Sequence, residues 1–371
     1  MNWQEVRRDF PALERHTYLN AAAAGPTPRP VSEAVAGYLR QLEADGDLHW
    51  DEWLERQERA RRRVAGFLNA EPDEIAFVAN TSTGINLIVD LLGQRGPVLS
   101  DELEFPTVTL PWIHRGAQVH LLPARNGVVE PADFASGRAP EAATIAVSHV
   151  QFSNGCRQDL DAFGALKGDR SLVVCASQSL GAFPVDVRSA RIDALASAGH
   201  KWLCAGYGAG LLYLSRELLE RHPAARIGWM SVEDPYAFDN RSFRVLSTAR
   251  RVEVGCPAFA GVFALEAAIA YLQDLGLDAI SARVLELNEM LTAALEQRGL
   301  EVLSPGGSHR SGQTLVAAPD PERAAAGLAE QGILVTRKPQ GVRIATHFFN
   351  TPEEVERAAG VLASLVAAHP C

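Results

Sequence analysis

The stretch SAGHKWLCAGYGAGLLYLS, from Ser197 to Ser215, places a lysine between His200 and Trp202, just before a glycine-rich segment and an apolar strand. Lys201 is a candidate nucleophile, because burial disfavours the ammonium form and a neutral amine forms a Schiff base with an aldehyde. An ordinary surface lysine in a loop is the alternative, and this stretch alone does not exclude it. The glycines at 206, 208 and 210 precede the strand instead of following one, which argues against a nucleotide-binding loop.

Upstream of this stretch, short apolar runs alternate with helical or loop segments, beginning at Ile75 and continuing to Leu214. The runs are IAFVAN, PVLS, QVHLLPA, ATIAVSHV, SLVVCAS and GAGLLYLS. This pattern predicts a largely parallel sheet buried on both faces, in a doubly wound α/β domain. Ligands bind at the carboxyl ends of such strands, so the residues just after each run are the candidates for chemistry.

One of these strand ends, in VANTSTGINLIVDLL (Val78 to Leu92), runs through several hydroxyl side chains into an amphipathic helix. Hydroxyls and free backbone N–H groups at a helix N-terminus suit a phosphate dianion. Plain N-capping by Ser or Thr explains the same residues, and both interpretations stay open here.

The rest of the chain divides by pattern into three parts. We predict an N-terminal segment at 1–15, a large α/β domain at 16–255 and a smaller α+β domain at 256–371. Helical spacing indicates helices from Val31 to Leu42 and from Trp50 to Leu68, and Arg61, Arg62 and Arg63 are expected on a solvated face of the second. The smaller domain is expected to contain helices at 257–275, 279–298 and 352–367 and strands near 314–318 and 341–346.

Composition narrows the class of protein further. The 371 residues are 47% hydrophobic and 22% charged, which excludes a mainly disordered or fibrous chain. A formal charge of −10 lacks the basic excess that nucleic-acid binding requires. There is neither a run of about 18 apolar residues nor a signal-peptide pattern, so we expect a soluble cytoplasmic protein with no membrane partner. Five cysteines without a CxxC pair indicate reduced thiols and no metal site.

Seven motifs, in this order, give the sequence a family resemblance. They are NTSTGIN, SDELEFPTVTLPW, SHVQFSNGCRQDL, ASQSLGAFPVDV, SAGHKWL, RVEVGCP and GVRIATHFFNTPEEV. The chain resembles the class V aminotransferases over nearly its whole length. These are fold-type-I pyridoxal-phosphate (PLP) enzymes that include cysteine desulfurases, kynureninase and isopenicillin N epimerase-like proteins.

The resemblance implies a fold, a cofactor and a set of site residues. The fold is that of a fold-type-I PLP-dependent transferase, the cofactor is pyridoxal 5'-phosphate, and Lys201 is the Schiff-base lysine and proton shuttle. It also implies a homodimer with shared active sites. The further implied positions are His200, Ser82 and Thr83 at the phosphate, Phe105 on the pyridine ring, Gln178 at the phenolic oxygen, Arg343 at the substrate α-carboxylate, and Asn20 and His347 in the substrate pocket.

Three departures from the family pattern affect the expected activity. Cys175 stands where the family has the aspartate that keeps the pyridine nitrogen protonated, so it either retunes the cofactor or marks a weakened enzyme. Cys256 replaces the threonine that reaches the phosphate of the neighbouring subunit. The segment Gly332 to His347 contains no cysteine, which argues against a sulfur-transferring desulfurase, and the terminal Cys371 is not a candidate to replace it.

We therefore expect a PLP-dependent enzyme that acts on a small amino acid or amine, like a class V aminotransferase. The alternatives are a C–S or other β-eliminating lyase or an epimerase without a persulfide cysteine, and a degenerate, non-catalytic protein of the same fold. Glu104 and Asp186 are expected to be structural, since Lys201 supplies proton transfer in the implied mechanism.

Overall fold

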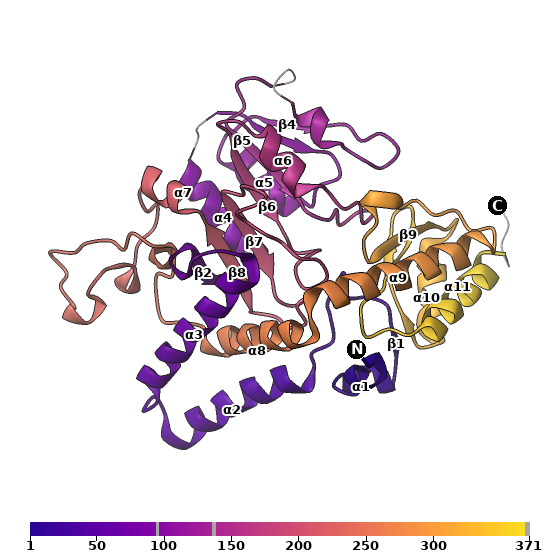
Figure 1. Ribbon diagram of the computed structural model, residues 1–371, viewed down its shortest axis with the longest axis horizontal. Coiled ribbons are helices and arrows are strands. Elements are labelled where there is room, and N and C mark those ends of the chain that lie inside the picture. Colours follow the sequence, from indigo (N-terminus) through magenta and orange to yellow (C-terminus); the bar gives the residue numbers. More distant parts are fainter. Residues whose placement is uncertain (94–95, 136–138, 368–371) are drawn as a thin grey trace.

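A mixed sheet forms the centre of this computed structural model, which describes residues 1–93, 96–135 and 139–367. In these residues seven strands pair in the order β2-β8-β7-β6-β5-β3-β4 (Figure 1). Strand β8 runs antiparallel to both β2 and β7, and the other neighbouring pairs are parallel. The strands are β2 (Ile75–Val78), β3 (Val98–Asp101), β4 (Val119–Leu122), β5 (Thr144–Ser148), β6 (Ser171–Cys175), β7 (Ala194–Ala198) and β8 (Gly210–Leu214). The predicted α/β class and all six predicted strands are confirmed.

Both faces of this sheet are buried along its central strands, as the continuous apolar runs predicted, whereas the edge strand β4 is only partly buried and its Leu121 is 51% exposed. In β6, Leu172 and Val174 join one hydrophobic cluster, and Val173 and Cys175 join the other. Helices α4 (Thr81–Leu92) and α5 (Pro106–His114) cover the face of Cys175, while α3 (Trp50–Leu68), α6 (Leu160–Leu166) and α8 (Phe259–Leu275) contribute to the cluster on the other face.

Strand β7 was missed by the sequence pattern, although it leads directly to Lys201. Its sequence, Ala-Leu-Ala-Ser-Ala, lacks the β-branched and aromatic residues that mark strands, and alanine is depleted in them. The strand forms because it lies between β6 and β8, where small side chains fit under α4: a Cβ built on Gly84 would stand 2.8 Å from the Cβ of Ala196. Its existence therefore depends on its neighbours rather than on its own propensity.

A second layer of structure lies toward the C-terminus. Strands β11 (Thr336–Lys338), β12 (Gly341–Ala345) and β9 (Gln313–Ala317) form an antiparallel sheet, and β1 (Thr17–Tyr18) pairs with β10 (Ile333–Leu334). Helices α9 (Leu277–Glu296), α10 (Pro321–Glu330) and α11 (Pro352–Ala367) share one hydrophobic cluster with these strands. The remaining α-helices are α1 (Trp3–Arg7), α2 (Arg29–Asp45) and α7 (Arg216–Arg221).

Helix α8 lies with the large domain, although the predicted limit at 256 assigns it to the smaller one. It runs beneath the main sheet beside α2 and α3 (Figure 1), and the Phe259 ring packs 5.6 Å from the Trp53 ring of α3. The bend between α8 and α9 falls at Gly276. We therefore propose that the division between the domains lies near Gly276.

Within the described residues, no single helix has both the length and the apolar composition to cross a bilayer. Helices α8 and α9 taken together have the length and the apolar composition of a membrane span, but a bend of 80° separates the two helices.

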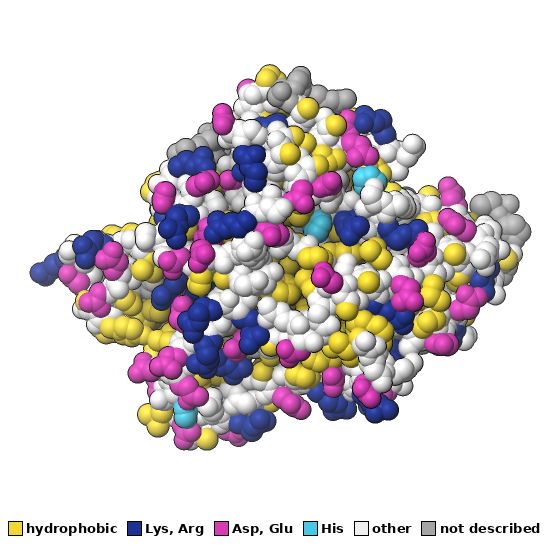
Figure 2. All heavy atoms as spheres, in the orientation of Figure 1, with side chains coloured by type: hydrophobic (Ala, Val, Ile, Leu, Met, Phe, Trp, Pro, Cys, Tyr) yellow, Lys and Arg dark blue, Asp and Glu magenta, His cyan; other side chains and the backbone are white. Residues whose placement is uncertain are grey.

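An arm, residues 226–248, projects from the large domain at the left of Figure 1 and carries the short 3-10 helices η4 (Trp229–Ser231) and η5 (Pro235–Ala237). In the space-filling view, charged side chains cover its tip and hydrophobic side chains appear beneath it (Figure 2). Its aromatic residues include Phe238, which is 71% exposed.

Candidate active site

Lys201 lies just beyond the carboxyl end of β7, beside the end of β6. Burial lowers the pKa of its amine, a thiolate at Cys175 would oppose this shift, and the charge of Arg343 lowers the pKa further. Its Nζ atom stands 5.9 Å from the centroid of the Phe105 ring. The position of Lys201 is thus that of a desolvated amine in a site, which removes the surface-lysine interpretation.

The loop before α2 packs tightly on the Lys201 backbone. The N–H of Gly25 donates to the His200 carbonyl at 2.7 Å, and a Cβ on Gly25 would stand only 2.3 Å from the Lys201 carbonyl oxygen. A larger residue at position 25 would therefore displace the segment that carries the lysine.

Helix α4 begins at the hydroxyl-rich stretch. Its N-cap is Asn80, whose side chain accepts from the Thr83 N–H at 2.9 Å, so neither serine nor threonine is the cap. The Thr81 hydroxyl bonds that of Ser177, and the Ser82 hydroxyl lies 2.5 Å from that of Thr107. These hydroxyls and the positive end of the helix dipole together suit a phosphate.

Cys175 ends β6, on the same face of the sheet as α4. Burial raises the pKa of its thiol, and the negative charge of Glu104 raises it further. Its Sγ atom lies 3.5 Å from the Ser177 hydroxyl. The thiol is therefore protonated at neutral pH and brings no negative charge to the site.

The neighbouring carboxyl, Glu104, is held in a buried network. It accepts from the Ser148 hydroxyl at 2.5 Å and from the Gln151 amide at 2.9 Å. Burial and the charge of Asp101 raise its pKa to about 8. These contacts support the structural role expected for Glu104.

Arg343, on β12, is 4% exposed, and its charge is close enough to Lys201 to lower the pKa of that amine. Nη1 donates to the Phe152 carbonyl at 2.9 Å, and Nη2 donates to the Thr336 hydroxyl at 3.4 Å. That hydroxyl donates in turn to Asn20, which links Asn20 to the arginine. The Nε atom finds no hydrogen-bond partner among the described residues.

Gln178 and His200 lie beside Lys201, since His200 precedes it in the chain and Gln178 bonds Trp202, which follows it. The Gln178 amide donates to the Ala22 carbonyl at 2.9 Å and accepts from the Trp202 indole at 2.9 Å, which fixes its orientation. The His200 ring stacks on Tyr207 at 4.6 Å. Burial, aided by the charge of Lys201, lowers the pKa of His200 to about 4, so the ring is neutral.

His347 lies inside an aromatic cluster with Trp202, Phe348 and Phe349. It is fully buried, with Nε2 3.0 Å from the Trp202 carbonyl and Nδ1 accepting from the Phe348 N–H at 2.9 Å. Burial lowers its pKa to about 4. Because both ring nitrogens are engaged by backbone, we propose a structural role for His347 rather than contact with substrate.

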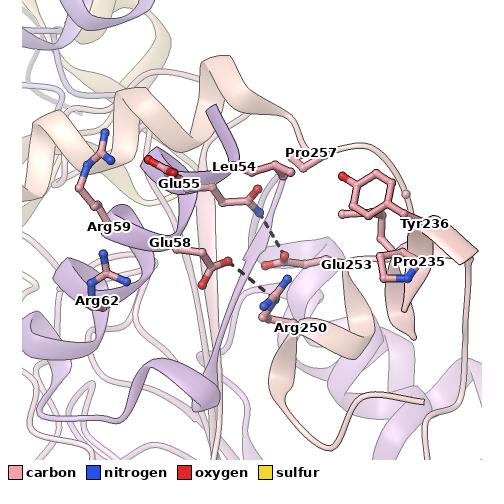
Figure 3. A pocket seen from close by; sticks show the side chains of 13 residues that line it. Leu54, Glu55, Glu58, Arg59, Arg62, Pro235, Tyr236, Arg250, Glu253 and Pro257 are labelled. Carbon is pink, nitrogen blue, oxygen red and sulfur yellow. Dashed lines mark hydrogen bonds and ion pairs between the residues drawn. The ribbon is translucent and has the colours of Figure 1, made fainter. Parts of the chain in front are cut away.

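The loop that carries the exposed Cys256 is held by a buried arginine, contrary to the expectation for Arg61. Arg61 is 1% exposed and pairs with Glu253 at 2.8 Å, so the prediction of a solvated face is wrong for this residue and holds for the exposed Arg62 and Arg63. Cys256 and Thr83 line one cavity of about 340 Å³. A second cavity, of about 450 Å³, opens beside Glu253, where Glu58 pairs with Arg250 (Figure 3).

The assembled residues fit PLP by the chemistry of their donors. Hydroxyls at a helix start suit its phosphate, a desolvated amine suits its aldehyde, and the Phe105 ring, 44% exposed, suits its pyridine. The fold and this site define a PLP-dependent enzyme of fold type I.

Comparison with known proteins identifies the family. The Aminotransferase class-V family matches residues 17–367. The "Uncharacterized aminotransferase YcbU" of Bacillus subtilis is 28% identical over 97% of both chains, and the isopenicillin N epimerase of Amycolatopsis lactamdurans is 29% identical over 98% of both. The apo structure of a cysteine desulfurase from Thermococcus onnurineus superposes with a TM-score of 0.90 at 26% identity, covering 99% of this chain and 98% of that one. The chain belongs to the class V aminotransferase family, whose cofactor is PLP.

Proposed function

We propose that this protein uses PLP to transform a small amino acid or amine, with Lys201 as the residue that binds the cofactor covalently. The observation that carries the proposal is the desolvated Lys201 amine, which lies close enough to Cys175 and to the buried guanidinium of Arg343 for their charges to affect its pKa. A lowered amine pKa makes the neutral, nucleophilic form available.

The other side chains of the site would bind different parts of the cofactor and the substrate. Ser82, Thr83 and the neutral His200 would hold the phosphate, Gln178 the phenolic oxygen, and Phe105 the ring. Arg343 would fix the substrate α-carboxylate, for which a guanidinium offers a bidentate fork.

In the reaction itself, PLP supplies electron withdrawal from the substrate's Cα. Lys201 Nζ would move the proton at that carbon, because burial lowers the pKa of its amine and so favours the neutral form that accepts a proton. Arg343 orients the substrate through its carboxylate, and the Asn20–Thr336 pair holds the arginine in place.

Cys175 favours a second candidate within the same family. A protonated thiol leaves the pyridine nitrogen without the anionic partner that full transamination uses. A β-elimination or an epimerisation needs less electron withdrawal and fits this site as well. Desulfuration through a persulfide is disfavoured, since residues 332–347 contain no cysteine.

Covalent trapping tests the role of Lys201. Borohydride reduction of the PLP-loaded protein is expected to attach the cofactor to the peptide that contains Lys201, detected by mass spectrometry. Lys201→Ala should lose the label and roughly 10³-fold or more of the turnover. Lys167→Ala, which alters a lysine bonded to Asp193 away from the site, is the control and should keep the label. Label on another lysine, or no uptake of PLP, would contradict the proposal.

We further propose a homodimer in a reducing, cytoplasmic compartment. The exposed aromatic side chains of the arm and the exposed Cys256 loop support an interface on this side of the molecule. The four cysteines within the described residues are free thiols, and Cys371 lies outside those residues.

A further inference from the structure

The hairpin of β11 and β12 brings a second basic residue to the face of Arg343. Thr336 pairs with Arg343 and Lys338 pairs with Gly341 across the two antiparallel strands. Directly paired residues lie on one face, and side chains two apart along a strand do so too. Thr336, Lys338 and Arg343 therefore share a face.

Lys338 and Arg343 also converge on one residue, Phe152. The Lys338 amine lies 4.3 Å from the Phe152 ring centroid, while the carbonyl of Phe152 accepts from Arg343. The Phe152 ring packs edge-on against Phe105 at 5.0 Å, and Phe105 faces the amine of Lys201. This chain of contacts places Lys338 on the substrate side of the site.

The charges at this end of the site are not balanced by the protein. Within the described residues, neither Lys338 nor Arg343 forms an ion pair with an Asp or Glu. Burial and the charges of Arg343 and Lys201 lower the pKa of Lys338 to about 8. An anionic ligand group near Lys338 would relieve this like-charge repulsion and stabilise its ammonium form.

We propose that Lys338 binds a second acidic group of the substrate, so that the enzyme selects amino acids with an acidic side chain. Arg343 takes the α-carboxylate and Lys338 takes the side-chain acid. The inference rests on the proposed function for its chemistry, while the contacts that place Lys338 beside Arg343 and Phe152 do not depend on that function.

The adjacent Arg337 provides a matched control. It lies on the same strand but points to the opposite face, where it is exposed and pairs with Glu322 at 3.0 Å. Removing the charge of Arg337 changes the net charge of the hairpin by the same amount as removing that of Lys338. It does not alter the face that carries Arg343.

Calorimetry with acids that lack an amino group tests the pocket without turnover. The PLP-loaded protein should bind succinate about tenfold or more tightly than butyrate, the scale of one charge-assisted hydrogen bond. Lys338→Met should abolish this preference, Lys338→Arg should largely keep it, and Arg337→Met should leave it unchanged. Equal binding of the two acids by the unaltered protein, or a preference that survives Lys338→Met, would overturn the proposal.

A second measurement separates this inference from the proposed function. Aspartate and glutamate should perturb the visible absorbance of the loaded protein at lower concentrations than asparagine and glutamine, by about tenfold or more. If the covalent label appears on Lys201 without such a preference, the substrate class is wrong and the function stands. If the succinate preference holds without a label on Lys201, the function is wrong and the acid-binding pocket stands.

Discussion

At the scale of single residues, burial and neighbouring charges control the ionisation of Cys175. This residue lies beside Ser148 across the β5–β6 pair, and Ser148 in turn binds the Glu104 carboxyl. The charge of Glu104 opposes ionisation of the thiol, while that of Lys201 favours it, and burial decides the outcome in favour of the neutral thiol. A carboxylate at position 175 would be buried in the same way and would lie near the same carboxyl group, that of Glu104.

The substitution Cys175→Asp tests this account through stability as well as activity. Without PLP the variant should be less stable by about 1–3 kcal/mol, because it buries an unpaired acid near Glu104. Added PLP should raise its melting temperature more than that of the unaltered protein, since the pyridine nitrogen would supply a partner. Its cofactor absorbance and turnover with amino acids should change too.

The isosteric Cys175→Ser is the control for that experiment and should behave like the unaltered protein with and without PLP. If Cys175→Asp leaves the absorbance, turnover and PLP stabilisation unchanged, Cys175 has no part in tuning the cofactor.

At the scale of elements, one buried cation ties helix α3 to the loop before α8. Arg61 donates to both Glu253 oxygens and to the Ile75 carbonyl of β2. Glu253 also accepts from the Phe77 N–H at 2.7 Å. The pair thus joins a helix, an edge strand and the loop that ends in Cys256, so the position of this loop depends on it.

Arg61→Met is expected to destabilise the protein by about 3–5 kcal/mol, because it leaves the largely buried Glu253 without its cation. Chemical denaturation followed by circular dichroism measures this loss. The exposed neighbour Arg62 provides the comparison: Arg62→Met should change stability by no more than about 0.5 kcal/mol. Equal effects of the two substitutions would show that the Arg61–Glu253 pair contributes little.

At the scale of the whole molecule, the projecting arm exposes large aromatic side chains that nothing in the described part of the same chain covers. The Trp229 and Phe238 rings stack at 6.2 Å, and Tyr236 accepts from the Trp50 indole at 2.8 Å, so the aromatic residues form one ordered surface. Large aromatic side chains exposed together are typical of an interface.

Phe238→Asp should therefore weaken self-association at least about tenfold, since it places a charge in the middle of the proposed interface. Sedimentation velocity over a range of protein concentrations measures this effect. Arg241→Asp, at an exposed charged position of the same arm, serves as a control and should shift the equilibrium much less. A protein that is monomeric throughout would contradict the proposed dimer.

The sequence by itself determined the features that depend on local pattern. The apolar runs of β5 and β6 and the helical segment of α8 each predicted an element that the fold confirms, and the order of the motifs predicted the family that the comparison confirms, while the role of Lys201 stays a prediction. These features could be predicted from the sequence because the periods of strands and helices, and the order of motifs, are properties of contiguous residues.

Only the tertiary structure decided the features that depend on distant neighbours. The alanine-rich β7 is a strand because β6 and β8 flank it, and Arg61 is buried because Glu253, almost two hundred residues away, lies beside it. Lys338 lies on the same face as Arg343 because of the register of the hairpin. The pairing of strands, their register and the burial of charged residues depend on which distant segments meet in the fold. The residues next to each position in the sequence carry little information about those meetings.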